Sequence, residues 1–116
     1  MQTPHRQHLG RLGERLAAAH FARLGFSVLA QNHHTRFGEL DLVLSDGRTL
    51  VFCEVKAKTG TGFGDPLEMV TPEKVRRVRR AAEVWLAAHD ECSGLEVRFD
   101  VVVERGGRLE HVADAF

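Results

Sequence analysis

The stretch of sequence that decides the fold is residues 38–58, GELDLVLSDGRTLVFCEVKAK. Leucines alternate with other side chains in residues 39–44, and residues 49–56 alternate again, which is the two-residue period of a β-strand. Between the two runs stands Asp46-Gly47, a strong signal for a tight hairpin turn. We therefore predict an antiparallel strand pair at the centre of the protein.

The predicted turn also sets the register of the two strands. A two-residue loop at residues 46–47 pairs Glu39 with Glu54 and Asp41 with Phe52. Asp41 is then the diagonal neighbour of Glu54, close enough for both carboxylates to bind one ion. Because opposed residues share a face, one side of the hairpin is expected to carry the charged side chains of Glu39, Asp41, Glu54 and Lys56.

The carboxylates on this face need compensation, because like charges repel across a strand pair. A divalent cation would remove the repulsion, and hard oxygen ligands suit Mg²⁺ or Mn²⁺. The alternative is a solvated polar face on which Lys56 neutralises Glu54, since short motifs of this kind also occur by chance. Glu54, however, interrupts an otherwise apolar run over residues 50–55, and a charge in such a place usually has a partner.

Asp41 followed by Glu54-Val55-Lys56 resembles the PD-(D/E)XK nuclease signature, in the form that lacks a proline before the aspartate. Along the chain, six stretches follow in order: GERLAAAHFARLGFSVLAQN, GELDLVL, LVFCEVKAK, FGDP, RFDVV and ADAF. Through these stretches, from about residue 12 to residue 116, the chain resembles the YraN-type family of bacterial proteins, which is similar to the archaeal Holliday junction resolvases. Lys58 stands where this family usually has arginine, and His33-His34 stands where an aromatic residue and an arginine are usual.

The resemblance implies a restriction-endonuclease-like core, and the residue pattern independently indicates an α/β protein with a mixed sheet flanked by helices. It also implies a site in which Asp41, Glu54 and Lys56 are catalytic. Asp41 and Glu54 would hold Mg²⁺ or Mn²⁺ with the backbone carbonyl of Val55 and with Glu14 or Glu39. Without the resemblance, Glu14 is better explained as a surface acid paired with Arg11.

The rest of the chain has the periodicity of a single α/β domain over residues 1–116, with residues 1–8 frayed. Asp100, in the fourth of the predicted strands, is expected to pair with Arg98 or a lysine rather than support the site. We expect His33 and His34 to be surface or phosphate-facing residues and not zinc ligands. The predicted elements are a helix over 9–24, strands over 26–31, 39–44 and 49–56, a second helix after Thr71, and strands over 96–104 and 109–112.

The second predicted helix and the loop before it offer a surface for nucleic acid. Thr71 is a typical N-cap and Pro72 suits the first helical position. The loop over residues 57–70 would bring Lys58 and Phe63 to the mouth of the site. Four basic residues are expected on the outer face of the helix, where they either contact phosphates or are simply solvated: Lys74, Arg76, Arg77 and Arg80.

The composition limits the class of protein but does not identify a binding partner. Lysine and arginine balance aspartate and glutamate at 16 each, which by itself argues against a strongly nucleic-acid-binding protein. No apolar run approaches membrane length and the N-terminus lacks the apolar segment of a signal peptide, so we expect a cytoplasmic protein without a membrane partner. Cys53 and Cys92 are too few and too far apart for a disulfide framework or a metal knuckle, and we expect reduced thiols.

Three functions remain open at this stage. The first is a metal-dependent endonuclease acting on DNA, with branched or single-stranded DNA as the candidate substrate. The second is a nucleic-acid-binding accessory protein of the same fold that does not catalyse. The third is an interaction module with no nucleic-acid partner, which the zero net charge permits. The resemblance also implies a homodimer, because resolvases make paired cuts, but the sequence locates no dimer face.

Overall fold

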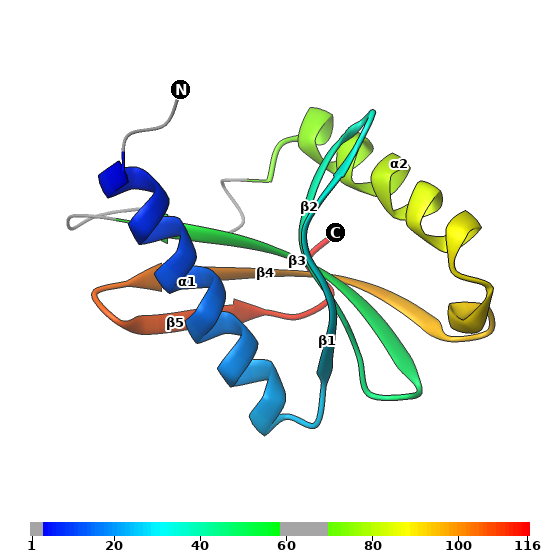
Figure 1. Ribbon diagram of the computed structural model, residues 1–116, viewed down its shortest axis with the longest axis horizontal. Helices are drawn as coiled ribbons and strands as arrows, with labels where there is room; N and C mark the ends of the chain where they lie inside the picture. Colours follow the sequence, from blue (N-terminus) through cyan, green and yellow to red (C-terminus); the bar gives the residue numbers. More distant parts are fainter. Residues whose placement is uncertain (1–3, 59–69) are drawn as a thin grey trace.

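The computed structural model describes residues 4–58 and 70–116 and consists of a five-stranded sheet between two helices (Figure 1). The strands lie in the order β1-β2-β3-β4-β5, and every neighbouring pair is antiparallel except β3 and β4. The mixed sheet and the flanking helices confirm the predicted α/β fold. The elements, in chain order, are α1 (Pro4–Arg23), β1 (Ser27–Thr35), β2 (Gly38–Ser45), β3 (Thr49–Lys58), α2 (Pro72–Ala88), a short 3-10 helix (Asp90–Cys92), β4 (Glu96–Arg105) and β5 (Arg108–Val112).

The sheet buries a separate hydrophobic cluster on each face, and one helix covers each cluster (Figure 1). Helix α1 packs Ala17 and Phe21 against one face, together with alternate residues of β2 and β3 such as Leu42 and Val51. Helix α2 packs Val78 and three further buried residues against the other face. The central strands β3 and β4 are therefore covered on both sides, which explains their nearly continuous apolar sequences. Neither helix, within the described residues, is long and apolar enough to cross a membrane.

Helix α2 begins as the sequence predicts. The Thr71 hydroxyl accepts the backbone N–H of Lys74 at 3.1 Å, and Pro72 occupies the first turn. On the buried side of the helix, Ala81 is fully buried, while Val75 and Leu86 are only partly so. The first turn of the helix lies beside β3, the central strand of the sheet, because Lys74 contacts Glu54 there.

Several elements are longer than the sequence indicates. Helix α1 begins at Pro4, and a proline at the start of a helix lacks only an N–H that would be unpaired there anyway. Strand β1 extends to Thr35, because its residues 33–35 pair with residues 38–40 of β2. The two predicted link residues His33 and His34 are therefore in a strand, with His33 packed against Trp85 at a ring distance of 5.2 Å and His34 exposed. Strand β3 continues to Lys58, and residues 59–69 of the predicted loop, including Phe63, lie outside the described residues.

The turn between β2 and β3 is wider than predicted. Ser45 pairs with Leu50, not with Arg48, so the register is displaced by two residues. The cause is the Asp46 side chain, whose Oδ1 accepts the backbone N–H groups of Arg48 and Thr49 at 2.9 and 2.8 Å and so organises a longer loop. Because the displacement is an even number of residues, Val43, Leu50 and Phe52 still share one face. Leu40 is an exception to the predicted alternation, because it packs with these residues and not with Leu42 and Leu44 on the α1 face.

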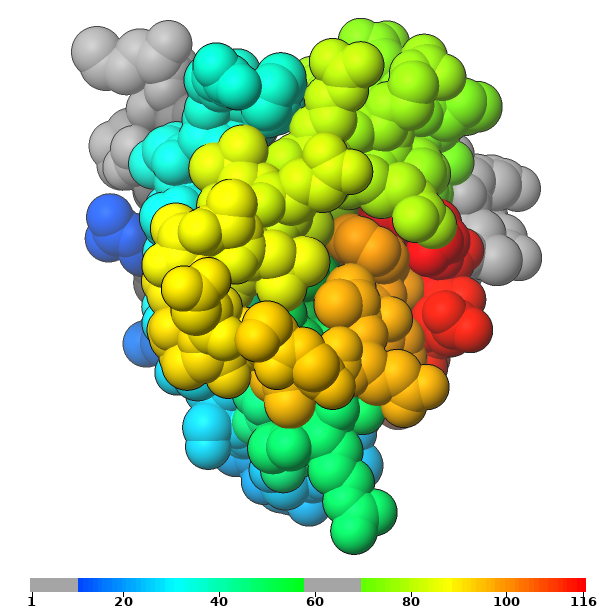
Figure 2. Space-filling model, turned by 90° about the vertical axis from the view of Figure 1, so that its right-hand side faces the viewer, coloured from blue at the N-terminus to red at the C-terminus, as the bar shows by residue number. Residues whose placement is uncertain are grey.

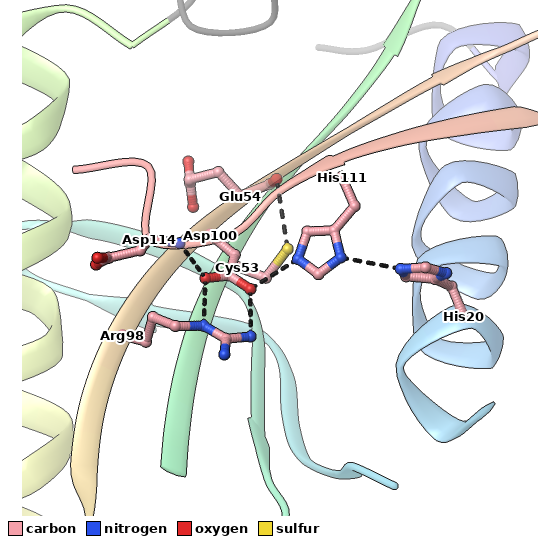
Figure 3. Close-up of polar contacts among 7 residues, drawn as sticks. All are labelled: His20, Cys53, Glu54, Arg98, Asp100, His111 and Asp114. Atoms are coloured by element: carbon pink, nitrogen blue, oxygen red, sulfur yellow. Dashed lines mark hydrogen bonds and ion pairs between the residues drawn. The ribbon is translucent and has the colours of Figure 1, made fainter. Parts of the chain in front are cut away.

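A buried polar network joins the α1 face of the sheet to the C-terminal segment (Figure 3). Asp100 on β4 is fully buried, and both of its oxygens accept hydrogen bonds from Arg98 at 2.8 Å, as the sequence predicts. His111 on β5 bonds the same carboxylate at 2.7 Å and also contacts His20 of α1 at 2.9 Å. Burial would raise the pKa of Asp100, but the hydrogen bonds from His111 and Arg98 outweigh it and hold the pKa below its usual value.

We predict that Asp100→Asn lowers the free energy of unfolding by about 2–4 kcal/mol, because it removes one charge from a buried pair; Arg98 remains partly open to water, which reduces the loss. Asp114→Asn is the matched control, because the hydrogen bond from Asp114 to Asp100 is donated by its backbone N–H and survives the substitution. Urea denaturation of both variants measures the difference. A loss in Asp100→Asn no larger than that in the control would contradict a stabilising role for the network.

Candidate active site

The candidate site lies where β2 and β3 separate. The last backbone pair between these strands is Leu42 with Cys53. One residue further, Oδ2 of Asp41 accepts the backbone N–H of Val55 at 2.9 Å. The carboxylate of Asp41 thus accepts a hydrogen bond from an N–H group of β3 that lies beyond the last backbone pair with β2. Continuing the register would set Asp41 opposite Glu54, one step closer than the diagonal placement predicted from the sequence.

Asp41 and Glu54 form a carboxylate pair that is largely removed from water. Glu54 is buried, with 7% of its surface exposed, and Asp41 is half-buried. Burial and then the charge of Glu54 raise the pKa of Asp41 to about 7, although the Val55 N–H and Lys74 act in the opposite direction. Asp41 is therefore close to its midpoint of ionisation at neutral pH, and a nearby cation would favour its charged form.

Two lysines complete this group, which we call the carboxylate–lysine cluster: Asp41, Glu54, Lys56 and Lys74. The Nζ atom of Lys74, in the first turn of α2, lies 3.2 Å from Oε1 of Glu54. Lys56 is exposed at the edge of the cluster, and its pKa is lowered first by the charge of Lys74 and then by burial, against the effect of Asp41 and Glu54. In Figure 3 the Glu54 side chain points away from α1, so the cluster and the Asp100 network occupy opposite faces of the sheet.

Glu14 and Glu39 are not grouped with the cluster as metal ligands in the described residues, although the charge of Glu39 contributes to the raised pKa of Asp41. The Glu14 carboxyl on α1 is hydrogen-bonded to Asn32, and its Oε2 is buried without a hydrogen-bond partner. Burial raises the pKa of Glu14, with a smaller contribution in the same direction from Glu39. Glu39 itself is exposed and has His34 at 3.9 Å. Across residues 4–58 and 70–116, no group of three or more histidine, cysteine, aspartate or glutamate residues is placed to hold a metal ion.

The carboxylate pair nevertheless fits a small hard cation. Magnesium keeps several waters in proteins and is commonly held by one or two carboxylates together with oxygens of a phosphate substrate. Asp41 and Glu54 supply two such carboxylates on adjacent strands. The unpartnered Oε2 of Glu14 is a further buried oxygen on the opposite helix, but it is not grouped with them.

The basic residues predicted to bind nucleic acid divide into two sets. Arg76, Arg77 and Arg80 are exposed on α2, as predicted. Lys74 is not on that outer face; the prediction was wrong because its position in the first turn points it at Glu54. Lys58 ends β3, and the structure does not describe its side chain.

The turn between β1 and β2 places Arg36 and Phe37 next to these exposed arginines. The sequence did not predict a role for either residue. The guanidinium of Arg36 lies 4.8 Å from the centre of the Phe37 ring, and that of Arg80 lies 5.6 Å from it. The turn is therefore held beside α2, as Figure 2 shows for the cyan and yellow-green segments. A basic residue next to an aromatic residue in a short link was the available signal.

The fold and the cluster define a small α/β protein with a mixed sheet and a carboxylate pair flanked by lysines. A sequence model of "Uncharacterised protein family UPF0102" matches residues 13–103, and the chain belongs to this family. The UPF0102 protein of Acidothermus cellulolyticus is 49% identical over 125 residues, covering 96% of this chain and 95% of its own. That of Frankia casuarinae is 50% identical, covering 93% and 95%, and that of Mycolicibacterium smegmatis is 48% identical, covering 93% and 88%.

We predict that Asp41→Asn stabilises the metal-free protein in a pH-dependent way. Because the pKa of Asp41 is raised from 3.8 to about 7, ionising this carboxyl destabilises the folded state as the pH rises through that range. The gain in unfolding free energy should therefore be small near pH 4 and reach about 2–4 kcal/mol above pH 7. Denaturation of both proteins in EDTA across this range measures it, with the exposed Glu83→Gln as control. A gain that is constant with pH would contradict the raised pKa.

Proposed function

We propose that this protein is a metal-dependent endonuclease that hydrolyses phosphodiester bonds in DNA, with branched or single-stranded DNA as its substrate. The observation that supports the proposal is the pairing of Asp41 and Glu54 at the point where two strands separate, with Lys56 beside them. Three charged groups so close together in a partly buried place are typical of a functional site. The sequence resemblance to the PD-(D/E)XK nucleases supports the same residues.

Each residue of the site has a separate role in this proposal. Asp41 and Glu54 would hold Mg²⁺ or Mn²⁺, and the Val55 N–H keeps the Asp41 carboxylate oriented toward the second strand. When bound by these carboxylates, the ion would polarise the phosphate as a Lewis acid and would lower the pKa of a water bound to it. Lys56, which is exposed beside the pair, orients the attacking water or offsets charge that develops on the phosphate. Glu14 and Glu39 are the remaining candidate ligands from the sequence.

The DNA would lie across α2 and the turn between β1 and β2. Arg76, Arg77 and Arg80 are exposed on the helix, and Arg36 lies beside the same Phe37 ring as Arg80. Guanidinium groups held in place by an aromatic ring lose less freedom when they bind phosphate. Lys58, at the end of β3, is a further contact in this proposal. A homodimer in the cytoplasm would supply two such sites for paired cuts.

The second candidate function is a non-catalytic nucleic-acid-binding accessory protein. The ion pair between Lys74 and Glu54 favours it, because one carboxylate of the site already has a cationic partner. In that case the basic surface of α2 would carry the function and the cluster would only stabilise the fold. Metal binding separates the two functions, and DNA binding is common to both.

We predict that Glu54→Gln and Asp41→Asn each abolish Mg²⁺-dependent cleavage of branched or single-stranded DNA and leave DNA affinity unchanged or raised, because each removes a negative charge near the phosphates. Lys56→Ala should lose cleavage but still bind Mn²⁺. The measurements are nuclease assays, DNA binding by fluorescence anisotropy and Mn²⁺ titration by calorimetry. Glu83→Gln, an exposed carboxyl on α2, is the matched control and should cleave normally. Cleavage that persists in both carboxylate variants would rule out this site.

We also predict that reversing the charges of Arg76, Arg77 and Arg80 to glutamate weakens DNA binding and flattens its salt dependence. Each phosphate contact releases counterions, so the slope of log K against log salt should fall by about 2 to 3 if all three residues bind phosphate. The matched control reverses Arg11, Arg15 and Arg23, which are exposed on α1 across the sheet. If the two sets of charge reversals weakened DNA binding equally, the affinity would depend on the net charge of the protein and not on the arginines of α2.

A further inference from the structure

We propose that Lys74 is an internal cation that holds the carboxylate pair in the metal-free protein, and that a divalent ion binds only by displacing it from Glu54. This inference rests on the proposed metal site and concerns how that site is loaded. The observation that supports the inference is the distance of 3.2 Å between the Lys74 ammonium group and Oε1 of Glu54.

The ion pair is well shielded from water. The side chain of Glu54 is 9% exposed and that of Lys74 is 22% exposed. Surface ion pairs contribute little because water and salt screen them, but a pair at this depth has few alternative partners. Without Lys74, the ionised Glu54 would lie beside Asp41, where β2 and β3 separate, with Lys56 as a nearby cation. Lys74 therefore compensates the carboxylate pair when no metal is bound.

A divalent ion and the Lys74 ammonium compete for the same oxygen. The ammonium group forms an ion pair with Oε1 of Glu54, and a metal ion would need that oxygen as a ligand. The two carboxylates and two lysines of the cluster balance in charge when all four are ionised. Adding a divalent ion with Lys74 still in place would therefore bring like charges together in a partly buried site. Withdrawal of Lys74 removes both the competition and the repulsion.

The local structure permits this withdrawal. Lys74 has a flexible four-carbon stem, and its side chain retains an exposed edge toward water. Its backbone is fixed, because its N–H donates to the Thr71 cap at the start of α2. The ammonium group can thus move toward solvent without unwinding the helix. There it joins the side of α2 that carries the exposed arginines.

The first test is Mn²⁺ titration by calorimetry of the full chain and of Lys74→Gln. Glutamine can still donate a hydrogen bond to Glu54 but carries no charge. The coupling between close, partly buried charges is worth enough to change a binding constant by about tenfold, so Lys74→Gln should bind Mn²⁺ about tenfold more tightly. Arg79→Gln is the matched control, because Arg79 is on the same helix over the Phe99 ring and outside the cluster. Its Mn²⁺ affinity should match that of the unsubstituted protein.

The second test follows Lys74 in the unsubstituted protein and does not require any variant to fold. The chain has three lysines, at positions 56, 58 and 74, so their acetylation rates can be followed separately by mass spectrometry. Lys74 should react slowly in EDTA and several-fold faster with saturating Mg²⁺. In Glu54→Gln, which removes its charged partner, Lys74 should react fast with or without Mg²⁺.

The outcomes separate this inference from the proposed function. Equal Mn²⁺ affinity in the unsubstituted protein and Lys74→Gln, or a Lys74 acetylation rate unaffected by Mg²⁺ at saturation, would overturn the inference and leave the metal site standing. Binding by Lys74→Gln alone would support the inference and count against a metal-dependent nuclease. Absence of Mn²⁺ binding in both proteins would overturn the inference and the proposed function together.

Discussion

The hydrogen bond from the Val55 N–H to the Asp41 carboxylate is the interaction on which the candidate site depends. It forms where the ladder between β2 and β3 ends after Leu42 and Cys53. A carboxylate that replaces a backbone acceptor is held in place by the sheet and not by its own rotamer. It therefore keeps a negative group close to buried Glu54, and burial, followed by the charge of Glu54, raises the pKa of Asp41.

Asp41 and Asp100, on the two faces of the sheet, differ in their hydrogen-bond partners and in the direction of their pKa shifts. On the α1 face, Asp100 has Arg98, His111 and a backbone N–H as partners, and its pKa is lowered. On the α2 face, Asp41 has one backbone N–H and an adjacent carboxylate, and its pKa is raised. A fully satisfied network stabilises a fold, whereas an incompletely compensated one is the more common property of a binding site. This contrast, not the presence of carboxylates as such, singles out the cluster.

The sequence was sufficient for the sheet and for the face that carries the cluster, because alternation in residues 39–44 and 49–56 depends on local geometry alone. It was not sufficient for the register, because the Asp46 side chain makes two backbone hydrogen bonds that widen the turn. It also misplaced Lys74. The helical period assigns that residue to an outer face, but the crossing of α2 over the sheet, which is a tertiary property, brings its ammonium group to Glu54.

The central claim is that Asp41 and Glu54 together bind a divalent cation in place of the Lys74 ammonium group. The most direct measurement is a crystal structure of the protein soaked in Mn²⁺, with anomalous scattering recorded near the manganese absorption edge. We expect one anomalous peak between the two carboxylates, with the Lys74 side chain withdrawn from Glu54. No peak at that position, with Lys74 still paired to Glu54 as it is in the metal-free arrangement, would contradict it.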